Sequence, residues 1–110
     1  MPTTYKVLGQ SAPNATTNTD IYTVPSNTQT VVSTIVVANR ASTVATYRIA
    51  IRLNGATISN QHYIAYDVAV GGGDSTTLTL GLTLDPAEII TVYASTANLS
   101  FNVFGAEITP

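Results

Sequence analysis

The sequence predicts an all-β protein, built as a two-sheet antiparallel β-sandwich of about eight strands. Threonine is the commonest residue, followed by alanine and valine, and β-branched side chains fit the surface of a sheet better than the wall of a helix. Apolar and polar residues alternate with a period of two in several segments, which is typical of half-buried strands. Turn residues separate these segments at short intervals, and no segment has the spacing of a full amphipathic helix.

The N-terminal part contains two short predicted strands, over residues 5–8 and 21–24. Pro25 blocks extension of the second strand because proline cannot donate a sheet hydrogen bond. Residues 9–19, between them, are the one extended polar segment, which we interpret as an arm or a long surface loop. Residues 30–38 carry apolar side chains at both parities, which predicts a strand covered on both sides and central in its sheet.

Two strands are predicted in the middle of the chain, over residues 47–53 and 62–70. Asn54 and Gly55 follow the first, and both accept the positive φ that a type I′ hairpin turn needs. Alternation places the larger side chains of each strand on one face: Tyr47, Ile49, Ile51 and Leu53 in the first, and Ile64, Tyr66, Val68 and Val70 in the second.

A flexible glycine turn at residues 71–74 leads into a predicted strand over residues 76–84. This strand has the clearest alternation in the chain, with one face made of four leucines: Leu78, Leu80, Leu82 and Leu84. Residues 85–88 then predict a single helical turn. Asp85 would be its N-cap, Pro86 its first residue, and Glu88 the glutamate three positions after the cap.

Strands over residues 89–94 and 99–103 complete the count. Gly105 is expected to mark a bulge that resets the alternation before Ile108. Eight short antiparallel strands pack as two sheets, and jelly-roll and immunoglobulin-like connections both fit this number. Residues 1–110 form a single domain, because a chain of 110 residues is too short for a second core.

Composition argues against several classes of protein. The chain has no cysteine, which excludes disulfides and thiolate chemistry. Four basic residues and a net charge of −2 argue against nucleic-acid binding through phosphates. No apolar run approaches the roughly 18 residues of a membrane span, and residues 1–20 show no apolar core of a secretory signal.

The titratable side chains give no pattern typical of catalysis. His62 is the only histidine, so a second histidine ligand for a metal is impossible, and we predict a half-exposed surface or interface side chain. Asp67 lies among apolar strand residues, which favours an ion pair with Arg48 or Arg52. We therefore predict no enzyme, no catalytic residue, no metal site and no cofactor.

The predicted surface favours contact with other proteins. Only 9% of the residues are charged, fewer than a soluble monomer normally carries. Six tyrosines combine an apolar ring with a polar tip, which suits interfaces. Threonine, serine and asparagine pack against neighbours without the desolvation cost of a charge.

Several strand and turn segments resemble small virion structural proteins of tailed bacteriophages, including those of cyanobacteria. The similar segments are residues 7–13, 21–25, 31–40, 47–50, 61–67, 80–84 and 92–96. This family includes head decoration, or cement, proteins that clamp neighbouring capsomers. The resemblance implies a β-sandwich or jelly roll bound as dimers or trimers at symmetry axes, and the polar segment 9–19 could reach a neighbouring subunit.

The leading hypothesis is a non-enzymatic capsid decoration (cement) protein, made in the host bacterial cytoplasm and located on the capsid surface of the virion. Its partners would be the major capsid protein or other virion proteins, and a second copy of itself, with no nucleic acid and no membrane. The candidate interface residues are Tyr5, Lys6, Arg48, Arg52, His62, Tyr63 and Asp67.

Two alternatives remain open. One is a structural protein of the tail, collar or baseplate. The other is a carbohydrate- or receptor-binding module in which one or more of four tyrosines stack on sugars: Tyr22, Tyr63, Tyr66 and Tyr93.

Overall fold

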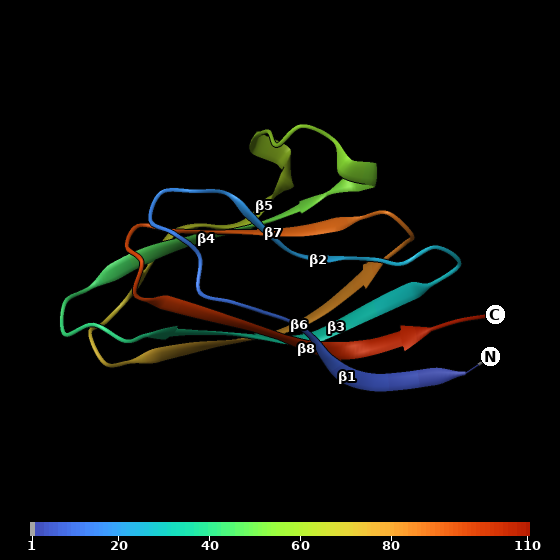
Figure 1. Cartoon of the computed structure of the whole chain (residues 1–110), viewed down its shortest axis with the longest axis horizontal. Coiled ribbons are helices and arrows are strands. Elements are labelled where there is room, and N and C mark those ends of the chain that lie inside the picture. The colour runs from blue at the N-terminus through green and yellow to red at the C-terminus, as the bar shows by residue number, and fades with distance from the viewer. Residues whose placement is uncertain (1) are drawn as a thin grey trace.

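A computed structural model describes residues 2–110 and confirms the all-β sandwich. Eight strands form two four-stranded antiparallel sheets, which lie as two layers in Figure 1. The first sheet has the order β1-β8-β3-β6, and the second has the order β2-β7-β4-β5. The strands are β1 (Thr3–Ser11), β2 (Thr19–Thr23), β3 (Gln29–Asn39), β4 (Ala45–Arg52), β5 (Tyr63–Val70), β6 (Ser75–Leu84), β7 (Ile89–Ala94) and β8 (Leu99–Ile108).

The connectivity is that of a jelly roll. Strand β1 pairs with β8, β2 with β7, β3 with β6 and β4 with β5, as in one long hairpin that has been rolled up. The chain changes sheet at every connection except the one between β4 and β5. This nested pairing decides between the two topologies that the strand count left open.

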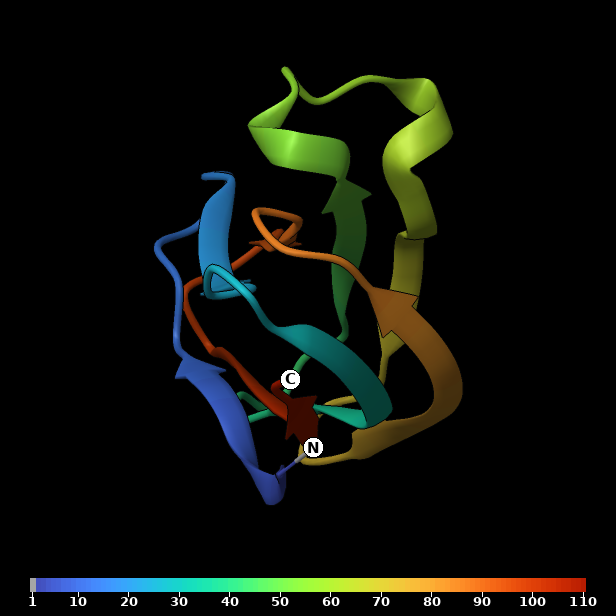
Figure 2. The same ribbon diagram turned by 90° about the vertical axis from the view of Figure 1, so that its right-hand side faces the viewer.

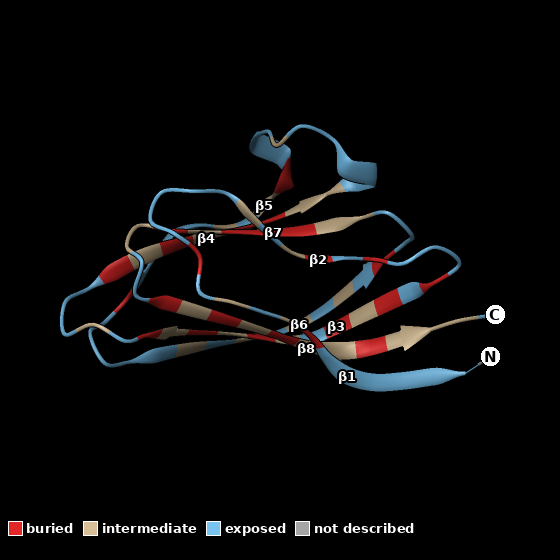
Figure 3. Ribbon diagram, in the orientation of Figure 1, coloured by how far each residue is buried: buried red, intermediate tan, exposed pale blue. Residues whose placement is uncertain are grey.

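The core lies between the two sheets, where the buried positions of facing strands meet (Figure 3). At its centre the rings of Tyr47 and Phe101 pack edge to face, with centroids 6.2 Å apart. Such pairs contribute to stability beyond the area they bury. The leucine face predicted for β6 packs against this core, and Leu84 is buried within it.

Strand β3 is central in its sheet, as predicted, but it is not covered on both sides. Ser33 has no partner on β8, because Val32 pairs with Gly105 and Thr34 with Phe104. This bulge shifts the alternation, so that apolar residues of both parities turn inward in successive parts of the strand. Residues on its other face, such as Val31, are only partly buried.

The predicted apolar face of β5 is wrong for the same kind of reason. Asp67 has a φ of 52°, and the pairing of β5 with β4 shifts between the partners of Tyr47 and Ile49. The extra residue reverses the alternation, so Val70 is buried while Ile64 and Tyr66 are exposed.

The segment 9–19 is not a free arm. Residues 9–11 belong to β1 and residue 19 belongs to β2. In the loop between them Pro13 is buried, and the Thr16 amide donates to the Ala94 carbonyl at 2.8 Å. The loop is therefore fixed to the body of the sandwich.

Asn54 and Gly55 form the predicted turn, but not a hairpin. Both have positive φ, and the Ala56 amide donates to the Leu53 carbonyl at 3.0 Å, which closes the turn. The chain then continues through η1 (Leu53–Gly55) and η2 (Asn60–His62) before β5 begins. Residues 53–62, which we name the 53–62 excursion, project beyond the two sheets in Figure 2.

Two further turns differ in part from prediction. Ala87 has a φ of 70°, so residues 85–88 are a β-turn and not a helical turn, although Glu88 Oε1 does accept from the Asp85 amide at 3.1 Å. The bulge predicted at Gly105 is wrong, because β8 pairs with both of its neighbours without skipping a residue of its own, so its alternation is not reset. The unpaired residues lie on the neighbouring strands, at Leu8 of β1 and Ser33 of β3.

Candidate interaction surfaces

The outward face of the first sheet is uncharged along its strands. Within residues 2–110 the outward strand positions of this sheet hold hydroxyl, amide and apolar side chains, and we name this surface the uncharged face. On β6 it consists of small exposed residues: Ser75, Thr77, Thr79, Gly81 and Thr83. Arg40 lies at one end, where it donates to Ser100 Oγ and to the Ala97 carbonyl.

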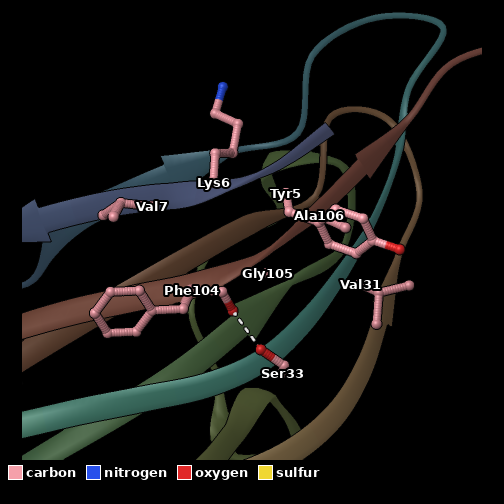
Figure 4. Close-up of a pocket in the computed structure, with 8 residues that line it drawn as sticks. All are labelled: Tyr5, Lys6, Val7, Val31, Ser33, Phe104, Gly105 and Ala106. Carbon is pink, nitrogen blue, oxygen red and sulfur yellow. Dashed lines mark hydrogen bonds between the residues drawn. The ribbon is translucent and has the colours of Figure 1, made fainter. Parts of the chain in front are cut away.

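An apolar hollow of about 590 Å³ lies on the uncharged face (Figure 4). It is lined by Tyr5, Lys6, Val7, Val31, Ser33, Phe104, Gly105 and Ala106. Gly105 and Ala106 leave little side-chain volume on β8, while larger residues of β1 and β3 stand on both sides of them. Tyr5, which lines one side of the hollow, is 84% exposed, so the face combines a projecting ring and a depression.

Lys6 does not charge this surface, because its side chain leaves β1 on the side opposite to Tyr5 (Figure 4). Its Nζ lies 3.1 Å from Glu107 Oε1, and Glu107 Oε2 accepts from the Tyr22 hydroxyl at 2.6 Å. The hydrogen bond from Tyr22 lowers the pKa of Glu107, and the hydrogen bond from Lys6 lowers it by a smaller amount. Burial and the nearby Glu107 raise the pKa of Tyr22, which keeps its hydroxyl protonated as a donor.

The outward face of the second sheet carries a cluster centred on Arg48. Its guanidinium carbon lies 4.2 Å from the ring centroid of Tyr66 and 4.4 Å from that of Tyr93, so it is held between two rings. Arg48 Nε also donates to Asp67 Oδ1 at 2.7 Å, which confirms the predicted ion pair. Hydrogen bonding to Asp67 raises the pKa of Arg48 further above its ordinary value.

Tyr63 extends this cluster toward the 53–62 excursion. Its ring meets that of Tyr66 edge to face, with centroids 4.8 Å apart. Tyr63, Tyr66 and Asn60 line an open hollow of about 510 Å³. We name Arg48, Tyr63, Tyr66, Asp67 and Tyr93 the tyrosine–arginine cluster.

Arg52, the second predicted arginine, fixes the excursion to the sheet. Its guanidinium donates to Asp20 Oδ1 at 2.8 Å, to Thr91 Oγ1 at 3.0 Å and to the Ala56 carbonyl at 3.0 Å. Each contact lies on a different segment of the chain. These contacts give Arg52 a structural role within the chain, because they hold the excursion against β2 and β7.

The prediction of a half-exposed His62 is wrong. The residue is only 8% exposed, and its Nδ1 accepts from the Ser59 amide at 3.0 Å, which closes the 3₁₀ turn of η2. A histidine used in this way stabilises the excursion and presents little surface to a partner.

The structure therefore separates the predicted interface residues into groups. Arg48, Tyr63 and Asp67 lie together on the second sheet, whereas Tyr5 and Lys6 lie on β1 of the first, pointing to opposite sides. Val31 and Phe104, which line the apolar hollow, were missed because the hollow forms only where β1, β3 and β8 lie side by side, and local pattern does not show which strands are neighbours. The polarity of β6 was the one local signal of this face.

Residues 2–110 contain no group of three or more histidine, aspartate or glutamate side chains placed to hold a metal ion. None of the helices in these residues has the length and apolar character of a membrane-spanning segment. Comparison of the chain with models of known protein families finds no match, and comparison with curated protein sequences finds none either.

Proposed function

We propose that this protein is a non-enzymatic structural component of a bacteriophage virion, in the form of a capsid decoration (cement) protein. One observation carries the proposal: a small domain presents a distinct candidate contact surface on each of its two broad faces. The uncharged face lies on one side, and the tyrosine–arginine cluster lies on the other. A subunit that clamps neighbours needs two such surfaces.

The chemistry of each face supports contact with protein. Hydroxyl and apolar groups can be buried at low desolvation cost, and the hollow would accept one apolar side chain of a partner. Tyrosine and arginine are enriched in the energetic centres of interfaces. Because Arg48 is already held by Asp67 and two rings, little side-chain freedom would be lost on binding.

The protein would act by binding the assembled capsid in preference to its unassembled or unexpanded forms. A protein that binds only the expanded shell stabilises that shell by mass action. Weak contacts repeated at symmetry-related positions would add through multivalency. The resemblance of several strand and turn segments of the sequence to phage virion proteins supports a phage capsid as the partner assembly.

Binding to phage heads tests this proposal. Purified protein is added to emptied, expanded heads of the phage that encodes the chain, and sedimentation measures bound protein while calorimetry measures head melting. We expect saturable binding and a higher melting temperature. Tyr66→Ser should weaken binding, whereas Asn14→Ala, in the exposed loop between β1 and β2 and away from both faces, serves as the surface control. Absence of binding to any head form would overturn the capsid assignment.

Copy number distinguishes the tail alternative. A cement protein is present in proportion to capsomers, whereas a tail, collar or baseplate component is present in proportion to rings. Quantitative mass spectrometry of purified particles measures this ratio, and a copy number that matches rings would move the protein to the tail.

The hollow beside Tyr63 and Tyr66 favours one second candidate, a carbohydrate- or receptor-binding module. The exposed ring of Tyr66 could stack on a sugar while the Asn60 amide offers hydrogen bonds. A glycan array with the isolated protein tests it, with Tyr66→Ser as the binding-site variant. Signal that is lost in this variant would favour this candidate, and an array without signal would remove it.

A further inference from the structure

We propose that the uncharged face is a homodimer interface, in which Tyr5 of each copy inserts into the apolar hollow of the other. Two features of the same patch make it self-complementary. Tyr5 projects and is 84% exposed, and the hollow that it helps to line has a volume of about 590 Å³. A twofold axis brings each projection to the partner's depression, which is the property of an isologous contact.

The charge distribution favours a second copy as the occupant. In a twofold contact each residue near the axis faces its own symmetry mate, so like charges there would repel. The strand positions of this face, within residues 2–110, carry no charged side chain. Lys6, the nearest cation, points to the opposite side of β1 and pairs with Glu107. The molecule's other broad face, in contrast, carries the Arg48–Asp67 ion pair.

The available area is sufficient for a dimer. Four strands about 4.8 Å apart and about ten residues long form a face on the order of 600 Å². Two such faces would bury roughly 1,200 Å² in total, which exceeds the ~1,000 Å² expected of a specific interface. The contact is at the small end of this range, so we expect a dimer that dissociates on dilution.

The dimer deepens the proposed function by assigning one face to a second copy, which leaves the two tyrosine–arginine clusters of the dimer for virion partners. The assignment of the dimer itself does not depend on a capsid. Self-association is measured on the purified protein, and head binding is measured separately. Failure of one proposal is therefore distinguishable from failure of the other.

Sedimentation velocity over a dilution series up to about 200 μM tests the dimer. We expect a monomer–dimer equilibrium in the unmodified protein. Tyr5→Ser should raise the dissociation constant at least tenfold because it removes the projecting ring. Ala106→Leu should have a similar effect because it fills the hollow while adding apolar surface. Tyr66→Ser, on the opposite face, is the matched control and should leave the dimer unchanged.

Cysteine pairing tests the geometry, since the chain contains no cysteine. Tyr5→Cys protein is mixed with Ser33→Cys protein under mild oxidation, so that a mixed disulfide can form only between copies. We expect this mixed disulfide, and far less from Tyr5→Cys with Thr77→Cys. A chain that stays monomeric throughout the series, or a dimer that both Tyr5→Ser and Ala106→Leu leave intact while circular dichroism shows them folded, would overturn the proposal.

Discussion

Asp67 reaches Arg48 from a backbone conformation that is rare inside a strand. Asp67 has a φ of 52° and lies at the bulge of β5, where it and Tyr66 together lie opposite Arg48 of β4. Its carboxylate accepts a hydrogen bond from Arg48 Nε at 2.7 Å. The bulge also turns Tyr66 outward, where its ring covers the guanidinium. One unusual backbone angle thus assembles the centre of the tyrosine–arginine cluster.

Substitutions at Asp67 separate its backbone role from its charge. Asparagine tolerates positive φ, so Asp67→Asn should lose the ion pair and keep the bulge. Asp67→Val should also strain the backbone and lower the free energy of unfolding by about 1–2 kcal/mol more than Asp67→Asn. Urea denaturation measures both values. Equal effects of the two variants would contradict a role for the bulge conformation.

Tyr47→Phe should leave stability unchanged or raise the free energy of unfolding by about 1 kcal/mol. Among the described residues, the Tyr47 hydroxyl is a buried polar group without a hydrogen-bond partner, and such a group carries an uncompensated desolvation cost. Burial also raises the pKa of Tyr47. Thermal and urea unfolding measure the change. A clear loss of stability would indicate that the hydroxyl has a partner, such as a buried water.

Glu107 should make stability sensitive to acid. Hydrogen bonds from Tyr22 and Lys6 lower the pKa of Glu107 below its ordinary value of 4.5, so its contribution is present above that value and is lost as pH falls through the lowered pKa of the folded state. Unfolding measured between neutral pH and about pH 2 should show this loss.

Variants of the network provide the controls for this acid transition. Glu107→Gln should flatten the dependence in the acid range. Tyr22→Phe removes the larger of the two lowering contributions, and it should move the transition to higher pH. Glu88→Gln, in the turn before β7, should leave the Glu107 contribution in place. An unchanged acid profile in Glu107→Gln would contradict the assignment.

Gly105→Ala should destabilise the fold strongly, by more than about 2 kcal/mol. A Cβ at this position would clash with the Val31 carbonyl of the neighbouring strand, and backbone cannot move aside as a flexible side chain can. Gly81→Ala is the matched control, because a Cβ there meets no atom within 4 Å, and it should be neutral or slightly stabilising. Urea denaturation compares the two, and equal effects would contradict the close approach at Gly105.

Much of the fold follows from local pattern. All eight strands were predicted, and β7 has the predicted bounds. The leucines of β6 face the core because nothing interrupts their alternation on that side. The errors in β3 and β5 have one cause, since a bulge depends on the partner strand and leaves no reliable mark in the strand itself. The loop over residues 12–18 was misjudged because polar composition does not show that its backbone is hydrogen-bonded to the sandwich.

The candidate surfaces were predictable only in part. The pairing of Arg48 with Asp67 was one of two options that strand parity allowed, and the structure confirms it. The apolar hollow was not foreseen, because its residues come from three strands that are far apart in the sequence. His62 and Arg52 were expected at a surface, but the fold uses both to hold the 53–62 excursion.

Read on its own, the chain determined the class of the fold, the approximate number of strands and the scarcity of charge. These depend on side-chain chemistry and on the two-residue period of a strand, which are local properties. The three-dimensional structure decided the nested jelly-roll pairing, the bulges and the separation of an uncharged face from a tyrosine–arginine face. Which strands become neighbours depends on contacts between distant segments, and those contacts set which side chains meet and which face outward.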